Sequence, residues 1–158
     1  MTSDETSNQA PPRQSVRLPI VATILALLGL ADAVYLTVHH YTATPVPCGA
    51  AFDCEMVLTS PYAEVAGIPL AAFGALAYFA AFSLALLTAF GDRRMWKLFG
   101  VQVTLMAVFS GWLIYVQAAL IGAFCQFCLI SAATTLTLFV IYIVSIFAKP
   151  RATAASSS

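Results

Sequence analysis

The tetrapeptide Cys125-Gln126-Phe127-Cys128 lies inside a run of sequence, Leu98 to Ala148, that contains no Asp, Glu, Lys or Arg. Because one crossing of a bilayer takes about 20 apolar residues, this run is too long for one membrane-spanning helix and about right for two. The chain must therefore turn once inside the run, and the turn signal in its middle is Ile121-Gly122-Ala123. This turn places the two cysteines at the start of the second helix, at the membrane surface.

Cys125 and Cys128 are one helical turn apart, so their sulfur atoms can close a small disulfide ring. The dipole at a helix N-terminus stabilises a thiolate, which is the reactive form of cysteine. We therefore interpret this CxxC motif as a redox pair held at the edge of a bilayer.

The composition of the 158-residue chain is that of an integral membrane protein. Hydrophobic residues make up 61% of it and charged residues 9%, whereas globular chains carry roughly 25% charged residues. The formal net charge is zero, so the composition indicates no nucleic-acid partner and no strongly acidic one.

Further apolar segments of spanning length predict an all-α integral membrane fold. We expect a bundle of four transmembrane helices over about residues 18–40, 66–90, 98–120 and 124–147. Prolines and acidic residues between the first two helices predict an extracytoplasmic loop or short-helix cap. Residues 17–149 would form this membrane domain, residues 1–16 a disordered tail and residues 150–158 a second tail.

The basic residues predict the orientation of the bundle. With four spans, all seven fall on one side of the membrane: Arg13, Arg17, Arg93, Arg94, Lys97, Lys149 and Arg151. The positive-inside rule makes that side the cytoplasm, so both tails are expected to be cytoplasmic. In the inner membrane of a bacterium, the cap and all the cysteines would then face the oxidising periplasm.

A second pair of cysteines, Cys48 and Cys54, lies in the outer loop. One interpretation is structural: two stabilising disulfides, or one disulfide and two buried thiols, in a scaffold without enzyme activity. Against it, a CxxC disulfide closes so short a ring that it adds little stability, and such bonds are readily exchanged. The resting pairing stays open, since four cysteines allow three full pairings.

The alternative interpretation is electron transfer by thiol–disulfide exchange between the two pairs. The loop pair, on a flexible tether, could reach outward to a soluble thiol protein and inward to the CxxC motif. The CxxC motif could pass two electrons to an acceptor dissolved in the lipid, and quinones are acceptors of that kind.

Four segments of the chain occur in an order that distinguishes one protein family from others. They are Gly29-Leu-Ala-Asp-Ala-Val-Tyr35-Leu-Thr37, the loop cysteines, Ser60-Pro-Tyr-Ala-Glu-Val-Ala-Gly67-Ile-Pro69 and the CxxC motif. In this order the chain, over roughly Ile20 to Phe147, resembles the bacterial branch of the vitamin K epoxide reductase family. The unrelated DsbB-type quinone reductases place the CxxC motif in the first outer loop instead. The resemblance is to the stand-alone form, without a fused thioredoxin domain.

The resemblance implies a role for each cysteine. Cys48 would form a mixed disulfide with a separate thioredoxin-like (DsbA-like) protein, and Cys54 would pass electrons to Cys125. Cys128 would face the quinone, which would be ubiquinone or menaquinone, and Ser60 would lie near the site. The implied function is a thiol:quinone oxidoreductase that reoxidises its partner and so supports disulfide-bond formation.

Reduction of a quinone epoxide, as of vitamin K, is the alternative within the same family. Mammalian members carry a tyrosine four residues after the second cysteine of the CxxC motif, where this chain has Ala132. This departure favours reduction of a plain quinone.

Asp32 lies well inside the first predicted helix, where a carboxylate is costly and marks a functional candidate. Alternatively, it lies near the outer end of the helix, protonated or hydrogen-bonded between helices. His39 and His40 could complete a zinc site with the loop cysteines, but adjacent histidines rarely ligate one ion, so we predict no metal.

Aromatic residues near the outer surface could line a quinone pocket: Phe52, Phe73, Phe109, Trp112, Tyr115 and Phe124. Aromatic residues also gather at membrane interfaces without any ligand, so packing or an interfacial belt is the alternative.

Overall fold

The computed structural model describes residues 14–147, and the side chains from Arg17 onward. Most of the two predicted tails, and three of the seven basic residues, lie outside this range. Residues 14–16, which we expected in the first tail, already belong to the first helix.

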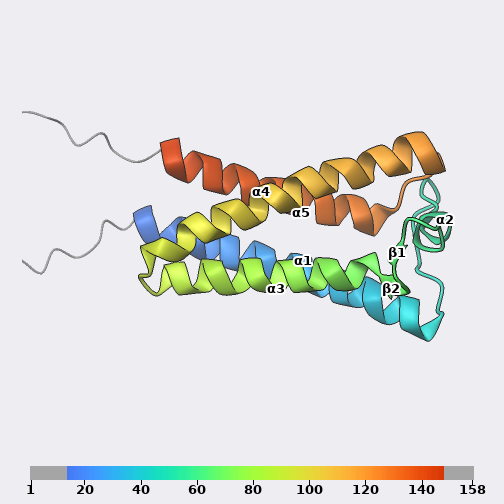
Figure 1. Cartoon of the computed structure of the whole chain (residues 1–158), viewed down its shortest axis with the longest axis horizontal. Helices are drawn as coiled ribbons and strands as arrows, with labels where there is room; N and C mark the ends of the chain where they lie inside the picture. Colours follow the sequence, from blue (N-terminus) through green and yellow to red (C-terminus); the bar gives the residue numbers. More distant parts are fainter. Residues whose placement is uncertain (1–13, 148–158) are drawn as a thin grey trace, which may run out of the picture.

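The described chain contains four helices long and apolar enough to cross a membrane, which confirms the predicted fold class. They lie side by side, and a small cap covers one end of the bundle (Figure 1). The long helices are α1 (Gln14–Thr42), α3 (Leu70–Ala89), α4 (Arg93–Tyr115), which continues as the π-helix η1 (Val116–Ile121), and α5 (Gln126–Phe147). The cap consists of the short helix α2 (Cys54–Leu58) and the strands β1 (Glu64–Val65) and β2 (Ile68–Pro69).

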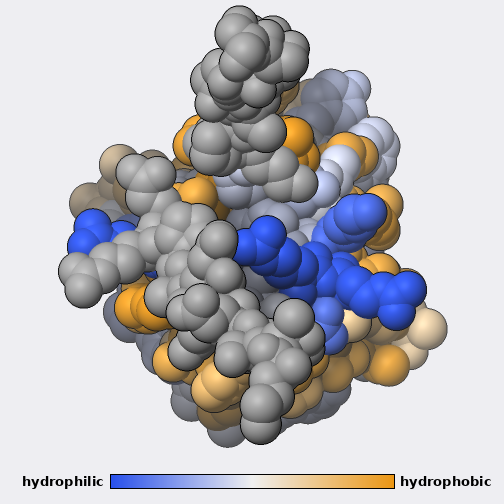
Figure 2. Space-filling model, turned by 90° about the vertical axis from the view of Figure 1, so that its left-hand side faces the viewer, coloured by the Kyte–Doolittle hydropathy of each residue, from blue (hydrophilic) through white to orange (hydrophobic). Residues whose placement is uncertain are grey.

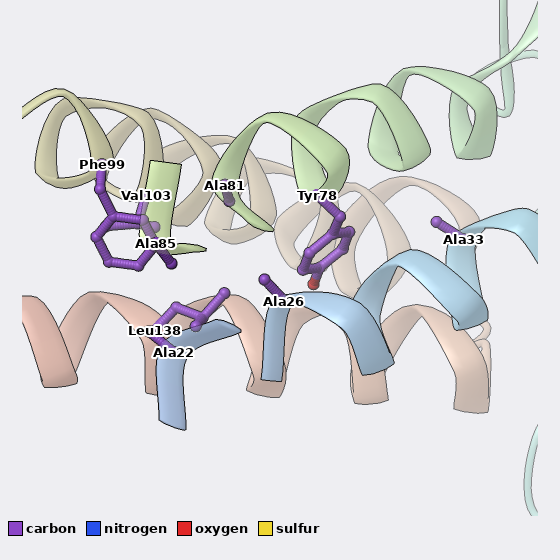
Figure 3. Packing of buried hydrophobic residues seen from close by; sticks show 9 residues of the cluster. All are labelled: Ala22, Ala26, Ala33, Tyr78, Ala81, Ala85, Phe99, Val103 and Leu138. Atoms are coloured by element: carbon purple, nitrogen blue, oxygen red, sulfur yellow. The ribbon is translucent and has the colours of Figure 1, made fainter. Parts of the chain in front are cut away.

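Small side chains let α1 and α3 approach each other closely. Buried alanines from both helices lie along this contact (Figure 3): Ala22 and Ala26 of α1 near Ala81 and Ala85 of α3, and Ala33 farther along α1 beside Gly74. Close approach matters because helices in lipid associate by van der Waals packing and not by the hydrophobic effect. Gly29 also belongs to this contact, since a Cβ atom there would overlap the ring of Tyr78.

The predicted turn between the third and fourth spans is confirmed at Gly122. This residue has a φ of 72°, in the left-handed region that glycine adopts without strain. Its N–H donates a hydrogen bond of 2.9 Å to the carbonyl of Gln117 in η1. The turn therefore ends the third helix and leads directly into the CxxC motif.

The start of the second span differs from the prediction. It begins at Leu70 and not at Ala66, because β1 and β2 pair antiparallel, with Glu64 opposite Pro69, and the chain turns between them. Ala66 and Gly67 form that turn with φ values of 54° and 78°. Two successive residues of positive φ are the signature of a tight hairpin turn, which excludes both from a helix.

The two ends of the bundle differ in charge. The basic residues of the described chain, Arg17, Arg93, Arg94 and Lys97, all lie at the end opposite the cap and are exposed. Figure 2 views this end, where hydrophilic side chains gather. The sides expose large apolar residues instead, among them Leu76 at 67%, Leu105 at 63% and Val108 at 70% exposure. An apolar girdle between polar ends is the surface expected of a multi-pass membrane protein.

Candidate redox site and cavity

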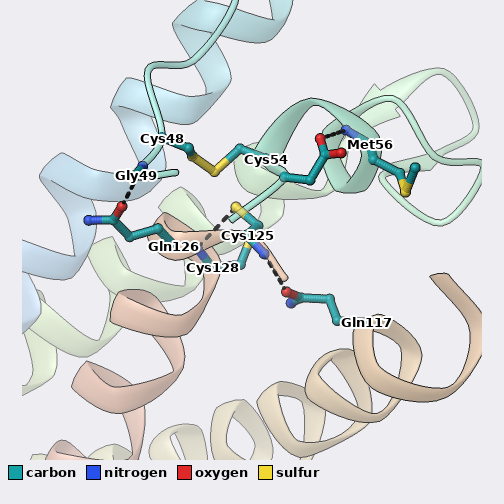
Figure 4. The surroundings of a disulfide bond; sticks show 9 residues. Cys48, Gly49, Cys54, Met56, Gln117, Cys125, Gln126 and Cys128 are labelled. Atoms are coloured by element: carbon teal, nitrogen blue, oxygen red, sulfur yellow. Dashed lines mark hydrogen bonds between the residues drawn. A yellow bond between two sulfur atoms is a disulfide. The ribbon is translucent and has the colours of Figure 1, made fainter. Parts of the chain in front are cut away.

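The four cysteines meet in one cluster where the cap contacts the start of α5. Cys48 and Cys54 are joined by a disulfide, and Cys125 and Cys128 are free thiols. Cys54 and Cys125 are fully buried and belong to the same apolar cluster, against which Cys48 and Cys128 pack (Figure 4). The fold therefore brings together two pairs that are 71 or more residues apart in sequence, as Cys54 and Cys125 illustrate.

Cys125 occupies the N-cap position of α5. Its carbonyl accepts the first helical hydrogen bond, from the N–H of Leu129 at 3.0 Å, and its Sγ accepts the N–H of Cys128 at 3.3 Å. A hydrogen bond from the Cys128 side chain, more than the backbone N–H groups of Cys128 and Phe127, lowers the pKa of Cys125, although burial opposes the shift. Cys125 is thus the sulfur at which a thiolate is stabilised.

Gln117 holds the start of α5 in place. Its side-chain Oε1 accepts a hydrogen bond of 2.9 Å from the backbone N–H of Cys125, and Gln117 itself is buried. The sequence analysis missed this residue. Its only signal was an amide side chain in a run without charges, a few residues before the turn.

The outer loop is fastened to α5 on both sides of its disulfide. After Cys48, the N–H of Gly49 donates a hydrogen bond of 3.1 Å to Oε1 of Gln126. Before Cys54, the N–H of Asp53 donates a hydrogen bond of 3.1 Å to the carbonyl of Phe124, just ahead of α5. The loop pair is therefore held over the CxxC motif. The expectation that it lies on a flexible tether is wrong.

A cavity of about 430 Å³ lies within the bundle below the cap. Its wall is mostly apolar, with a few polar groups, as in sites that bind small molecules. Its wall includes Asp32, Ser60, Phe73, Tyr78, Cys128 and Ala132. Cys128 lies on the wall and Cys125 does not, so the two cysteines of the motif face different surroundings.

Of the six aromatic candidates, Phe73 and Phe109 line this cavity. The other four are not on its wall, and their role at a quinone stays a prediction: Phe52, Trp112, Tyr115 and Phe124. Their exposures of 37%, 55%, 54% and 40% are similar to those of Phe73 and Phe109, and Trp112 borders a separate, smaller groove with Phe109. Their orientation follows from the rotation of each segment about its axis, which spacing along the chain does not reveal.

Two polar groups from neighbouring helices face the cavity. The hydroxyl of Tyr78 donates a hydrogen bond of 2.6 Å to the carbonyl of Ser131 and contacts the hydroxyl of Thr135 at 2.8 Å. Asp32 also lies on the wall, and its buried Oδ2 has no hydrogen-bond partner among the described residues. The expected alternative of a carboxyl hydrogen-bonded between helices is therefore wrong for this oxygen.

The histidines at the end of α1 have different partners. Nε2 of His40 lies 3.2 Å from Oε1 of Glu64, whereas Nδ1 of His39 lies 2.9 Å from the hydroxyl of Thr44. The loop sulfurs are joined to each other, and within residues 14–147 no group of three or more His, Cys, Asp or Glu residues is placed to hold a metal ion.

The arrangement brings a disulfide against a pair of thiols and places one of those thiols on the wall of an apolar cavity, which is a setting for redox chemistry. A comparison with protein families agrees with this chemistry. The family model described as the vitamin K epoxide reductase family matches residues 20–143 of this 158-residue chain. The matched segment includes every cysteine and all four spanning helices except the ends of the first and last. The chain therefore belongs to the vitamin K epoxide reductase family, whose members are quinone-related oxidoreductases of membranes.

Proposed function

We propose that this protein is a thiol:quinone oxidoreductase that reoxidises a thioredoxin-like (DsbA-like) protein. The observation that carries the proposal is that the two cysteines of the CxxC motif have different surroundings. Cys125 is buried in the same cluster as Cys54 of the loop disulfide, whereas Cys128 packs against that cluster and also lies on the wall of the apolar cavity. A motif with one sulfur toward each side is suited to pass electrons between them.

The first exchange takes place at the loop. A thiolate of the reduced partner attacks Cys48, which is half-exposed, and Cys54 leaves. The second thiol of the partner then releases Cys48, so the partner gains a disulfide and the loop pair gains two electrons and two protons. Buried Cys54 is out of direct reach, which favours Cys48 as the partner's target.

The second exchange takes place between the pairs. The thiolate of Cys54 attacks Cys125 in the oxidised CxxC motif, the Cys125–Cys128 bond breaks, and Cys128 leaves as a thiolate on the cavity wall. Cys48 then attacks Cys54, which re-forms the loop disulfide and releases Cys125 as a thiolate. The N-terminus of α5 stabilises that thiolate, so Cys125 is the better leaving group in this last step.

The cavity suits a quinone ring as electron acceptor. Its volume of about 430 Å³ lies within the range of roughly 300–1,000 Å³ typical of small-molecule sites. Reduction to the hydroquinone would re-form the Cys125–Cys128 disulfide. Ala132 lies on the wall where mammalian members have a tyrosine, which supports a plain quinone, ubiquinone or menaquinone, over an epoxide.

The charge distribution supports a definite orientation. The described basic residues lie at the end opposite the cysteines, so by the positive-inside rule the cap faces away from the cytoplasm. In the inner membrane of a bacterium the termini would be cytoplasmic, and the partner would be a separate periplasmic protein.

The test is a reconstituted assay in detergent. The purified protein is mixed with a reduced DsbA-like protein and either ubiquinone or menaquinone, and quinone absorbance is followed for the wild type and Cys125→Ala. Loss of quinone that depends on Cys125 is the expected result. No loss with either quinone would contradict the proposal, and an assay with a quinone epoxide would then separate epoxide reduction from a scaffold without activity.

A further inference from the structure

Asp32 is a carboxyl group without an assigned role in the electron path. It comes from α1, lies on the wall of the same cavity as Cys128, and keeps Oδ2 buried without a hydrogen-bond partner among the described residues. A carboxylate in an apolar cavity is unfavourable unless a cation or several donors stabilise it. The described residues of the wall include no Lys or Arg. The site therefore favours binding of a proton by Asp32.

The other titratable groups on the wall are less suited to carry a proton. Tyr78 of α3 has its hydroxyl engaged with Ser131 and Thr135. His40, on the same helix as Asp32, lies against Glu64, and Tyr62 belongs to the cap loop. Helix α4 contributes only uncharged groups such as Gln102 and Ser110, and α5 contributes the thiol of Cys128. Asp32 is the one carboxyl among the described residues of the wall.

The proton balance of quinone reduction requires such a group. Conversion of a quinone to a hydroquinone consumes two electrons and two protons. The CxxC motif supplies both electrons when its disulfide forms. Because the N-cap geometry favours a thiolate at Cys125, the motif brings only one proton, that of Cys128. The second proton must come from another group at the cavity.

We infer that Asp32 is the proton carrier of this site: it binds the proton released as Cys125 becomes a thiolate and donates it to a quinone oxygen. The inference rests on the proposed function and names the residue that donates the second proton. Before the step, the site holds the Cys125 thiolate, the Cys128 thiol, the Asp32 carboxyl and the quinone. Afterwards it holds the Cys125–Cys128 disulfide, the Asp32 carboxylate and the hydroquinone, so the net charge is unchanged.

The loop pair restores the proton. When the dithiol of Cys48 and Cys54 reduces the CxxC disulfide, two thiol protons are released into the site. Cys128 takes one, and Asp32 takes the other while Cys125 stays ionised. The negative charges of the Asp32 carboxylate and the Cys125 thiolate repel each other, so reduction of the motif itself drives Asp32 to bind the proton.

Infrared difference spectroscopy on the purified full-length protein tests this without a quinone. Reduction by dithiothreitol is expected to add the C=O band of a protonated carboxyl in the wild type. The band should shift in Asp32→Glu, vanish in Asp32→Asn, and be absent in Cys125→Ala, which has no CxxC disulfide to reduce. A wild-type spectrum without the band, or a band that persists in Asp32→Asn, would overturn the inference. If Asp32→Asn fails to fold, the shift in Asp32→Glu decides.

Turnover gives the second readout. Asp32→Asn is expected to lower the rate of quinone reduction about 100-fold or more, the usual contribution of a general acid. Asp92→Asn is the matched control, because Asp92 caps α4 at the opposite end of the bundle and should leave turnover unchanged.

The outcomes separate the two proposals. A wild-type rate of quinone reduction in Asp32→Asn overturns the role of Asp32 and leaves the proposed function intact. If the wild type reduces no quinone, the proposed function fails, and the infrared band still decides whether Asp32 binds a proton when the motif is reduced.

Discussion

Gln117 and Cys125 are joined across the turn between the last two spans: Oε1 of the glutamine accepts the backbone N–H of the cysteine at 2.9 Å. Both residues are buried, and the backbone carbonyl of Gln117 also accepts the N–H of Gly122. The turn and the first residue of the CxxC motif are thus held by one amino acid of the preceding helix. The position of the reactive sulfur depends on that helix as much as on α5.

Gln117→Leu keeps the size of the side chain and removes the acceptor. The N–H of Cys125 is then buried without a partner, which is expected to cost about 1–3 kcal/mol. Thermal unfolding in detergent, followed by circular dichroism, measures the loss. Gln102→Leu serves as the control, because the amide of Gln102 makes a longer contact of 3.4 Å to the carbonyl of Ala77. An equal loss in both variants would contradict a special role for Gln117.

Cys128→Ser is expected to stop quinone reduction, because the motif can no longer form its disulfide. Since Cys54 and Cys125 pack in one cluster, the thiolate of Cys125 can attack Cys54 of the loop disulfide and release Cys48, which should trap a Cys54–Cys125 disulfide. Non-reducing electrophoresis and mass spectrometry of the digested protein detect this bond. Cys125→Ser should give no such bond. Normal quinone turnover in Cys128→Ser would remove the mechanism.

The thiolate of Cys125 is expected to persist at pH values at which an ordinary cysteine is already protonated. The largest cause of its lowered pKa is the hydrogen bond from the side chain of Cys128. Cys128→Ala removes this donor, so the pH midpoint of the Cys125 titration should rise. Ultraviolet absorbance of the thiolate, with the loop pair kept as a disulfide, measures it. In Cys128→Ser, which retains a donor, the midpoint should rise less. A midpoint that is unchanged in both variants would exclude this cause.

Gly29→Ala is expected to destabilise the bundle by about 1–3 kcal/mol, because the new methyl group would overlap the ring of Tyr78 and force α1 and α3 apart. Gly111→Ala is the matched control: a Cβ atom there meets nothing within 4 Å. As alanine is the better helix former, that variant should be neutral or up to about 1 kcal/mol more stable. Similar effects of the two substitutions on the unfolding temperature would argue against close packing at Gly29.

Local chemistry explains why much of this protein could be predicted from its sequence. Hydrophobic length defines a membrane span, and a glycine in a long apolar run defines a turn, so the four helices and the turn at Gly122 follow from composition along the chain. The hairpin at Ala66 and Gly67 was missed because its strands are only two residues long, too short for any alternation of side chains.

The sequence by itself determined the four spans, the place of the CxxC motif at a helix start, and the family motifs that carry redox chemistry. Only the tertiary structure decided which side chains share the cavity. Phe73 faces it and Trp112 does not, Asp32 lies on the same wall as Cys128, and Gln117 reaches Cys125. The physical reason is that spacing fixes which residues share a helix face, whereas packing between helices fixes where that face points.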